Sequence, residues 1–159
     1  MSTMRITDVI VQWLEMQEWE ERPEVDEENQ TSSTGFDHSV NDDFSVTGYL
    51  DAAEKAGFIK LFMYFNDTKI PASKIDEVIK FVNLVNVGIP IGLLAVIPSK
   101  KVLRFYAAID VEEAALEPRH ISNLMGAGLR TMERRLPQFM AICFGGKTAE
   151  EALEIEPEE

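Results

Sequence analysis

Apolar side chains recur at intervals of three and four residues in three stretches of this chain, which places them on one face of a helix. The pattern predicts helices over residues 4–19, 71–86 and 118–144. Asn83 and Asn86 lie at the end of the second of these helices. Because asparagine tolerates the left-handed conformation found at helix ends, we expect the pair to satisfy loose backbone carbonyls there.

The third predicted helix is the longest, and Pro118 suits its first turn. Gly126 and Gly128 lower its helix propensity, and we expect them to let its backbone approach the sheet closely. Proline removes a backbone hydrogen bond, so Pro137 should kink this helix or begin its final segment.

Alternation of apolar and polar residues, or short apolar runs between turn residues, marks the strands. We predict strands over 44–50, 58–65, 89–97 and 102–109, and a fainter polar edge strand over 30–38. The elements then follow in the order helix, two or three strands, helix, two strands, helix. This order predicts an α+β domain with an antiparallel sheet of about five strands.

Acidic residues dominate the chain of 159 residues, with 28 Asp and Glu against 15 Lys and Arg and a formal net charge of −13. Such a field repels a nucleic-acid backbone, so we expect no nucleic-acid partner. Two segments concentrate the negative charge. We interpret 18–29 as a solvated connector inside a single domain spanning 1–147, and 148–159 as an acidic tail that is partly helical.

No part of the sequence has the pattern of a membrane segment or a secretion signal. The longest apolar run, 85–97, is broken by polar residues, glycines and a proline, and it is shorter than the ~20 residues that span a bilayer. Cys143 is the single cysteine, so no intrachain disulfide forms, and its place on an apolar stripe indicates an inert core thiol. We therefore expect a cytoplasmic protein that does not bind a membrane.

No catalytic or metal-binding pattern emerges from the residues. His38 and His120 are the only histidines, and no zinc spacing accompanies them. Residues 145–148 end like a phosphate-binding loop but lack its first glycine and follow a helix instead of a strand. We expect no metal, no cofactor and no enzymatic activity. An enzyme would need a cluster of carboxylates with perturbed pKa values in a cleft, which a sequence does not display.

Two kinds of binding residue are candidates. The second helix and the two strands after it are more apolar than one core requires, which indicates a protein interface. The interface candidates are Phe81, Leu84, Leu93, Leu94, Phe105 and Tyr106. The alternative is a small-molecule sensor whose anion site is built from Arg104 on a strand and from Arg130 and Arg134 on the basic last helix.

Two side chains each allow two interpretations. Trp13 either packs the first helix onto the sheet or docks that helix on a partner, where tryptophan is over-represented. Arg104 either pairs with an acidic residue across the sheet or binds an anion.

From about residue 58 to 155 the chain resembles the YbjN-domain family of bacterial proteins, which are described as sensory-transduction regulators. The order and spacing of several short segments carry the resemblance. They are Ile70-Pro71 before a helix, Asn83-Leu84-Val85-Asn86, Leu103-Arg104-Phe105-Tyr106, Glu117-Pro118, Leu136-Pro137-Gln138-Phe139 and Gly145 to Ala152. The acidic segment before Gln30 departs from the family's pattern and leaves the position of the first strand open.

The resemblance implies a fold similar to that of type III secretion chaperones. It also implies a non-enzymatic regulator or chaperone-like binder, with a dimer as one form, and without established catalytic residues. Our leading hypothesis is therefore a bacterial protein-binding module whose partner the sequence does not identify, with a homodimer as one arrangement. The sensor of anionic ligands and the enzyme remain the other two hypotheses.

Overall fold

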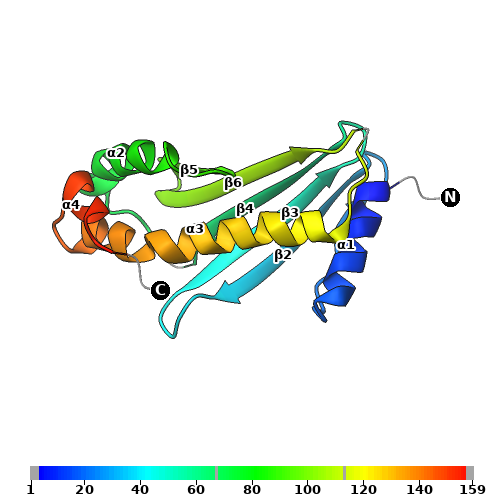
Figure 1. Cartoon of the computed structure of the whole chain (residues 1–159), viewed down its shortest axis with the longest axis horizontal. Coiled ribbons are helices and arrows are strands. Elements are labelled where there is room, and N and C mark those ends of the chain that lie inside the picture. The colour runs from blue at the N-terminus through cyan, green and yellow to red at the C-terminus, as the bar shows by residue number, and fades with distance from the viewer. Residues whose placement is uncertain (1–3, 67, 113, 157–159) are drawn as a thin grey trace.

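Antiparallel strands form a single sheet, and helices cover one of its faces (Figure 1). This computed structural model describes residues 4–66, 68–112 and 114–156. The helices are α1 (Arg5–Met16), the short 3-10 turn η1 (Ala72–Lys74), α2 (Ile75–Asn86), α3 (Pro118–Phe144) and α4 (Ala149–Leu153). The strands are β1 (Glu24–Asp26), β2 (Thr31–Ser39), β3 (Ser45–Ala53), β4 (Phe58–Phe65), β5 (Leu93–Ile97) and β6 (Val102–Asp110).

The strands of the described residues lie in the order β1-β2-β3-β4-β6-β5, and each pairs with its neighbours in the antiparallel sense. The long helix α3 runs across one face, α1 lies at one end of it, and α2 and α4 lie at the other end (Figure 1). The predicted α+β class and antiparallel sheet are confirmed, with six strands instead of about five.

Three strand boundaries differ from the prediction for physical reasons. β3 continues to Ala53, because it keeps its pairing with β4 through residues that we expected to turn. β5 begins at Leu93 instead of residue 89, since Pro90 has no N–H to donate and Gly92 adopts a left-handed φ of +79°. The sixth strand, β1, lies in the expected connector and is exposed throughout, so no apolar alternation marks it.

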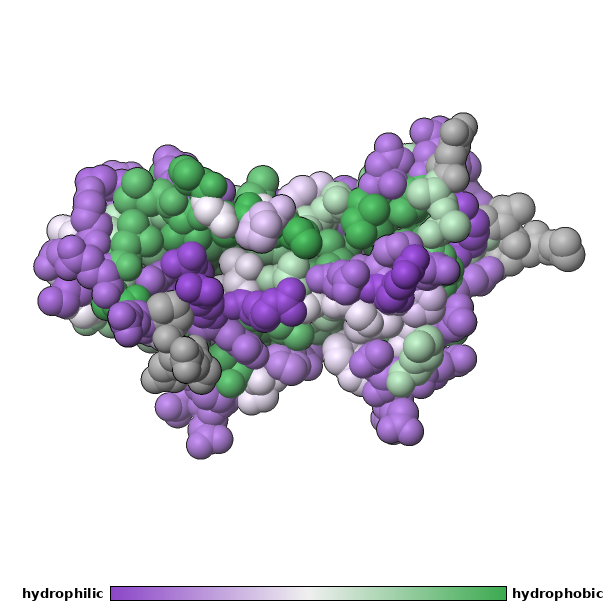
Figure 2. Space-filling model, in the orientation of Figure 1, coloured by the Kyte–Doolittle hydropathy of each residue, from purple (hydrophilic) through white to green (hydrophobic). Residues whose placement is uncertain are grey.

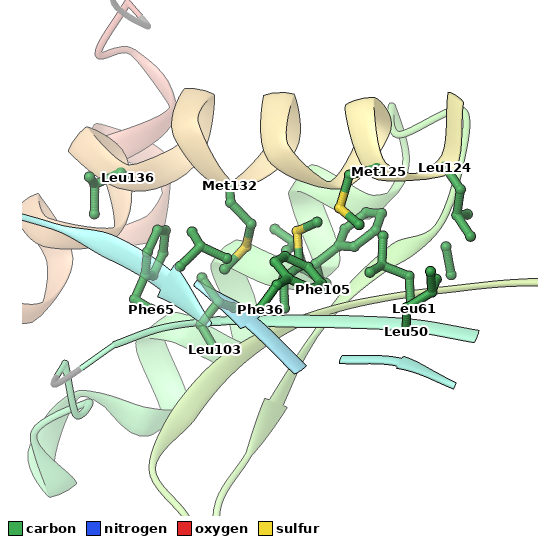
Figure 3. Packing of buried hydrophobic residues seen from close by; sticks show 14 of the residues in the cluster. Phe36, Leu50, Leu61, Phe65, Leu103, Phe105, Leu124, Met125, Met132 and Leu136 are labelled. Atoms are coloured by element: carbon green, nitrogen blue, oxygen red, sulfur yellow. The ribbon is translucent and has the colours of Figure 1, made fainter. Parts of the chain in front are cut away.

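Alternate residues of the central strands point to the same side, where they form the core with α3 (Figure 3). On β4 the buried positions are Ile59, Leu61, Met63 and Phe65. The other side of the sheet carries half-buried side chains from the intervening positions. We call this second side the outer face.

The backbone of α3 lies close to the sheet at Gly128. A Cβ atom there would lie 2.8 Å from the Met63 side chain and 3.0 Å from the Phe105 ring, so the expected role of this glycine is confirmed. Gly126 instead faces the side chain of Arg130 on the same helix. α3 is one helix to Phe144, so the prediction that Pro137 begins a separate segment is wrong.

Long-range hydrogen bonds attach α1 to the rest of the domain. The Glu54 carboxylate accepts from the backbone N–H groups of Ile6 at 3.1 Å and Thr7 at 2.8 Å. It thereby caps a helix start for which no neighbouring side chain provides a cap. Trp13 is 3% exposed and its Nε1 donates to Ser122 Oγ of α3 at 2.9 Å, which supports the packing interpretation for this residue.

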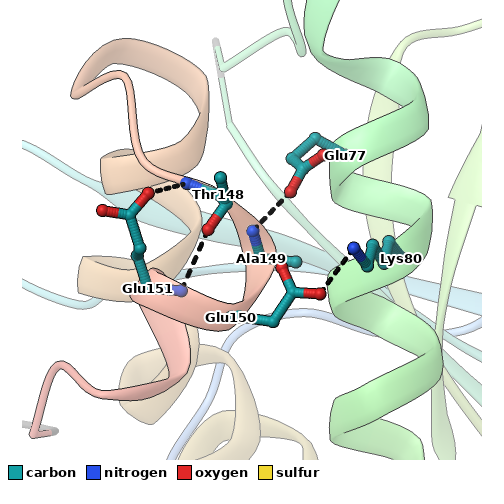
Figure 4. A network of polar contacts seen from close by, with 6 residues as sticks. All are labelled: Glu77, Lys80, Thr148, Ala149, Glu150 and Glu151. Atoms are coloured by element: carbon teal, nitrogen blue, oxygen red, sulfur yellow. Dashed lines mark hydrogen bonds and ion pairs between the residues drawn. The ribbon is translucent and has the colours of Figure 1, made fainter.

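The segment after Lys147 packs on the domain and does not form a free tail as far as Ile155. Thr148 caps α4 through its hydroxyl, and Ala149 and Ala152 are fully buried between α4 and its neighbours. The Glu77 carboxylate of α2 accepts from the Ala149 N–H at 2.6 Å (Figure 4). The segment that we interpret as a partly helical acidic tail therefore contains α4, whose Ala149 and Ala152 pack in the core.

An ion pair joins the same two helices. Lys80 Nζ of α2 lies 2.5 Å from Glu150 Oε1 of α4 (Figure 4). This hydrogen bond raises the pKa of Lys80 and lowers the pKa of Glu150. Both side chains are more than half exposed, so the pair orients α4 more than it stabilises the domain.

The thiol of Cys143 should be inert in the folded protein. Cys143 is 4% exposed, and burial raises its pKa to about 11. Because the thiolate is the reactive form, we expect labelling by 5,5′-dithiobis(2-nitrobenzoate) at pH 8 to be slower than for an unfolded thiol by at least about a hundredfold. The release of the coloured thiolate in native buffer and in 6 M guanidinium chloride measures this ratio. Equal rates would contradict the assignment.

Candidate binding surfaces

Exposed apolar side chains gather on α2 and on the segment that leads into β5. These residues are Ile79 (37% exposed), Leu84 (42%), Val87 (89%), Ile91 (46%) and Leu93 (42%). Figure 2 shows hydrophobic residues collected over this end of the molecule, against the hydrophilic surface of α3. We call the five residues the α2–β5 patch. Clustered exposed apolar residues of this size indicate an interaction surface.

Half of the predicted interface residues are not on the surface. Phe81, Leu94 and Phe105 are at most 1% exposed and belong to the core, so they are corrected as interface candidates. The sequence shows that these elements are apolar on more than one side. It does not show which sides the helices cover, where α3 packs against β6, α4 against α2 and α2 against β5, because these contacts form only in the folded chain. Leu84, Leu93 and Tyr106 remain accessible.

Asn86 holds α2 against the edge of the sheet. Its side-chain nitrogen donates to the Leu94 carbonyl at 2.9 Å, and its side-chain oxygen accepts from the Leu94 N–H at 2.8 Å. The expected left-handed cap is absent, because Val87 continues with a helical φ of −58°. The asparagine amide binds the strand instead of the helix end, which sequence spacing does not reveal.

Aromatic and cationic side chains cover the outer face of the sheet. The rings pair across neighbouring strands, with centroids 5.2 Å apart for Phe62 and Tyr106 and 6.4 Å apart for Tyr49 and Tyr64. The Arg104 guanidinium carbon lies 4.8 Å from the centre of the Phe62 ring and 5.9 Å from that of Tyr106. Among the described residues, no acidic side chain forms an ion pair with Arg104.

The α2–β5 patch and the outer face meet at the edge of the sheet. Leu93 of the patch is the cross-strand partner of Tyr106 on the outer face. One ligand of sufficient size can therefore contact both surfaces.

A pocket of about 510 Å³ lies on the outer face beside Arg104. Its lining residues are Ser33, Tyr49, Asp51, Phe62, Tyr64, Lys69, Ile97, Lys100, Val102 and Arg104. Strands β2, β3, β4, β5 and β6 contribute its floor, and the loops that carry Lys69 and Lys100 form one wall.

The three arginines of the predicted anion site do not come together. Arg130 and Arg134 line a different pocket of about 340 Å³, between α3 and residues 88–91. α3 packs on the core face of the sheet, whereas Arg104 belongs to the outer face, so the prediction of one site is wrong. The sequence does not show which face of the sheet α3 covers. It therefore does not show whether arginines of α3 and an arginine of β6 lie on the same face.

The structure offers no indication of a catalytic centre within the described ranges. Carboxyl groups with a lowered pKa, those of Asp26, Glu150 and Glu151, are exposed and lie in local hydrogen bonds with Asn29, Lys80 and Thr148 respectively. In the same part of the chain, no group of three or more His, Cys, Asp or Glu side chains is arranged to hold a metal ion. No described helix has both the length and the apolar character needed to cross a bilayer.

Comparison with known proteins defines the fold. No protein-family model matches the sequence, and no curated protein matches it either. A chain in the crystal structure of the ExsC–ExsE complex superimposes with a TM-score of 0.58 at 12% sequence identity, over 85% of this chain and 94% of that one. The fold is type III secretion chaperone-like. At this identity the similarity defines the architecture and not the activity.

Proposed function

We propose that this chain is a non-enzymatic bacterial protein-binding module with a chaperone-like or regulatory role, of the kind that the YbjN resemblance implies. The α2–β5 patch carries the proposal, because five large apolar side chains of α2, of the segment that follows it and of the start of β5 are exposed. The fold supports it, since the structure that superimposes on this chain is that of the ExsC–ExsE complex.

The partner segment that fits this surface is apolar on one side and basic beside it. Apolar anchors would be withdrawn from water against Leu84, Val87 and Leu93, which are 42–89% exposed. The net charge of −13 attracts a basic segment and accelerates its encounter with the patch. An amphipathic helix would present such a pattern.

Charges placed in the patch should release the partner and leave the fold intact. Leu84→Asp combined with Leu93→Asp introduces two carboxylates at positions that are already 42% exposed. Because truncation of an interface anchor commonly costs about 2 kcal/mol or more, we expect retention of the partner polypeptide to fall by at least about tenfold. Native mass spectrometry of protein purified from its own cells, without refolding, measures the retained polypeptide.

Met16→Glu is the matched control, because Met16 is 62% exposed and lies at the end of α1, at the opposite end of the molecule (Figure 1). It should retain the polypeptide at the wild-type level. Equal retention by the patch variant would remove the patch from the interface. A homodimer that dissociates only in the patch variant would assign the patch to a second copy, and a bare monomer in the wild type would overturn the proposal.

A further inference from the structure

Arg104 is a cation that forms no ion pair with an acidic side chain of the described residues. Its cross-strand neighbours are Tyr64 on β4 and Ala95 on β5, neither of which carries a negative charge. The Arg104 Nε is buried and has no hydrogen-bond acceptor in the described residues. A buried donor that is left unpaired costs free energy, so this atom indicates a function outside the folding of the sheet.

Aromatic rings lie beside the guanidinium of Arg104 at cation–π distances. The guanidinium carbon lies 4.8 Å from the Phe62 ring centre and 5.9 Å from that of Tyr106. A guanidinium held by cation–π contacts keeps N–H groups that can donate hydrogen bonds. Paired N–H groups of an arginine suit two oxygens of one phosphate or carboxylate group.

Two further cations lie in the same pocket. Lys69 Nζ donates to the Lys100 carbonyl at 3.2 Å, which ties together the two loops that bear these lysines. Among the described residues that line the pocket, Asp51 has the one carboxylate, and it accepts a hydrogen bond of 2.6 Å from Ser33 Oγ. The described lining therefore has three positive charges and one negative charge, in a chain whose net charge is −13. The excess favours a dianion such as a phosphate monoester over a single carboxylate.

The remaining lining is aromatic and aliphatic. Tyr49 and Tyr64 stack with centroids 6.4 Å apart, and Ile97 and Val102 lie at the same pocket. A hydrogen bond with Tyr49, together with partial burial, raises the pKa of Tyr64 to about 12, so this hydroxyl stays protonated at neutral pH. The volume of about 510 Å³ falls within the range of small-molecule sites.

We propose that this pocket binds a phosphorylated small molecule that carries a planar ring. Arg104 holds two phosphate oxygens, Lys69 and Lys100 supply the further positive charge, and the ring lies against the tyrosines. The site is separate from the α2–β5 patch and does not rest on the proposed partner.

Isothermal titration calorimetry with adenosine 5′-monophosphate, guanosine 5′-monophosphate, pyridoxal 5′-phosphate and phenyl phosphate tests the site. At least one of these probes should bind, and its dephosphorylated counterpart and inorganic phosphate alone should each bind at least about tenfold more weakly. Affinity should fall as salt is added, because the lysines are exposed. No measurable heat from any of the four probes at millimolar concentration would overturn the proposal.

Arg104→Gln should weaken the probe that binds by about tenfold or more, since a charge-assisted bidentate contact is lost. Arg119→Gln is the matched control, because Arg119 is exposed and pairs with Glu117 at the start of α3, outside the pocket. Circular dichroism establishes whether Arg104→Gln is folded. Should it unfold, Lys69→Gln combined with Lys100→Gln carries the test, because both lysines are exposed.

Unchanged affinity in the folded arginine variant, or in the double lysine variant, would overturn the assignment. The patch variant Leu84→Asp/Leu93→Asp should bind the probe as the wild type does. This separates a failure of the pocket from a failure of the proposed protein partner.

Discussion

Replacing Phe105 by alanine should lower the free energy of unfolding by about 3–5 kcal/mol. Phe105 is fully buried on β6, and its ring lies between the glycine of α3 that approaches the sheet, Gly128, and Gly92 before β5. Truncation would empty the place where helix, sheet and edge strand meet (Figure 3). Domains are commonly stable by about 5–15 kcal/mol, so a large part of the total would be lost.

Urea unfolding followed by tryptophan fluorescence and by circular dichroism at 222 nm measures the change. Phe144→Ala removes the same atoms from a side chain that is 61% exposed at the end of α3. That control should change stability by no more than about 0.5 kcal/mol. Similar losses in the two variants would contradict the position of Phe105 in the core.

Gly48→Ala should destabilise the domain by about 2–3 kcal/mol, although it adds only one methyl group. Gly48 on β3 is the cross-strand partner of Phe36 on β2, and the Phe36 ring covers it. A Cβ atom at residue 48 would lie 2.1 Å from Cζ of that ring. The ring must move, and it would lose its packing against Trp19, whose ring centre is 5.9 Å away.

Gly88→Ala is the control for the backbone effect of replacing glycine. A Cβ atom there would meet only the Val85 carbonyl oxygen, at 3.9 Å, so we expect no loss of stability. Thermal unfolding by circular dichroism measures both variants, and the Trp19 emission reports the displacement of Phe36. A Gly48→Ala protein as stable as the wild type would show that the ring does not cover this position.

The spacing of apolar residues predicts those helices and strands whose buried side chains recur at regular intervals. The alternation over 58–65 matches β4, Pro118 begins α3, and Asn86 ends α2. Elements without such a pattern were missed or misplaced. β1 was absent from the prediction because Glu24–Asp26 are all exposed.

Long-range contacts explain the errors at the candidate sites. The apolar character of their elements predicts Phe81 and Leu94 at an interface, but both are buried in the core, where α2 packs against β5 and α4 packs against α2. The sequence leaves two interpretations of Arg104 open. The acidic partner of the first interpretation is absent from the described residues, whereas the aromatic setting of the guanidinium emerges only when β4 lies beside β6.

The two hydrogen bonds between the Asn86 side chain and the Leu94 backbone should also hinder the addition of a further strand at β5. On the outermost strand of a sheet, alternate residues direct their N–H and C=O groups away from the sheet. When these groups have no partner, they can pair with a strand of another chain. β5 is five residues long, and one side-chain amide occupies both groups of Leu94. A foreign strand would therefore find this row of groups interrupted. The protein can display an apolar patch beside a sheet edge because the edge itself is unsuited to fibril growth.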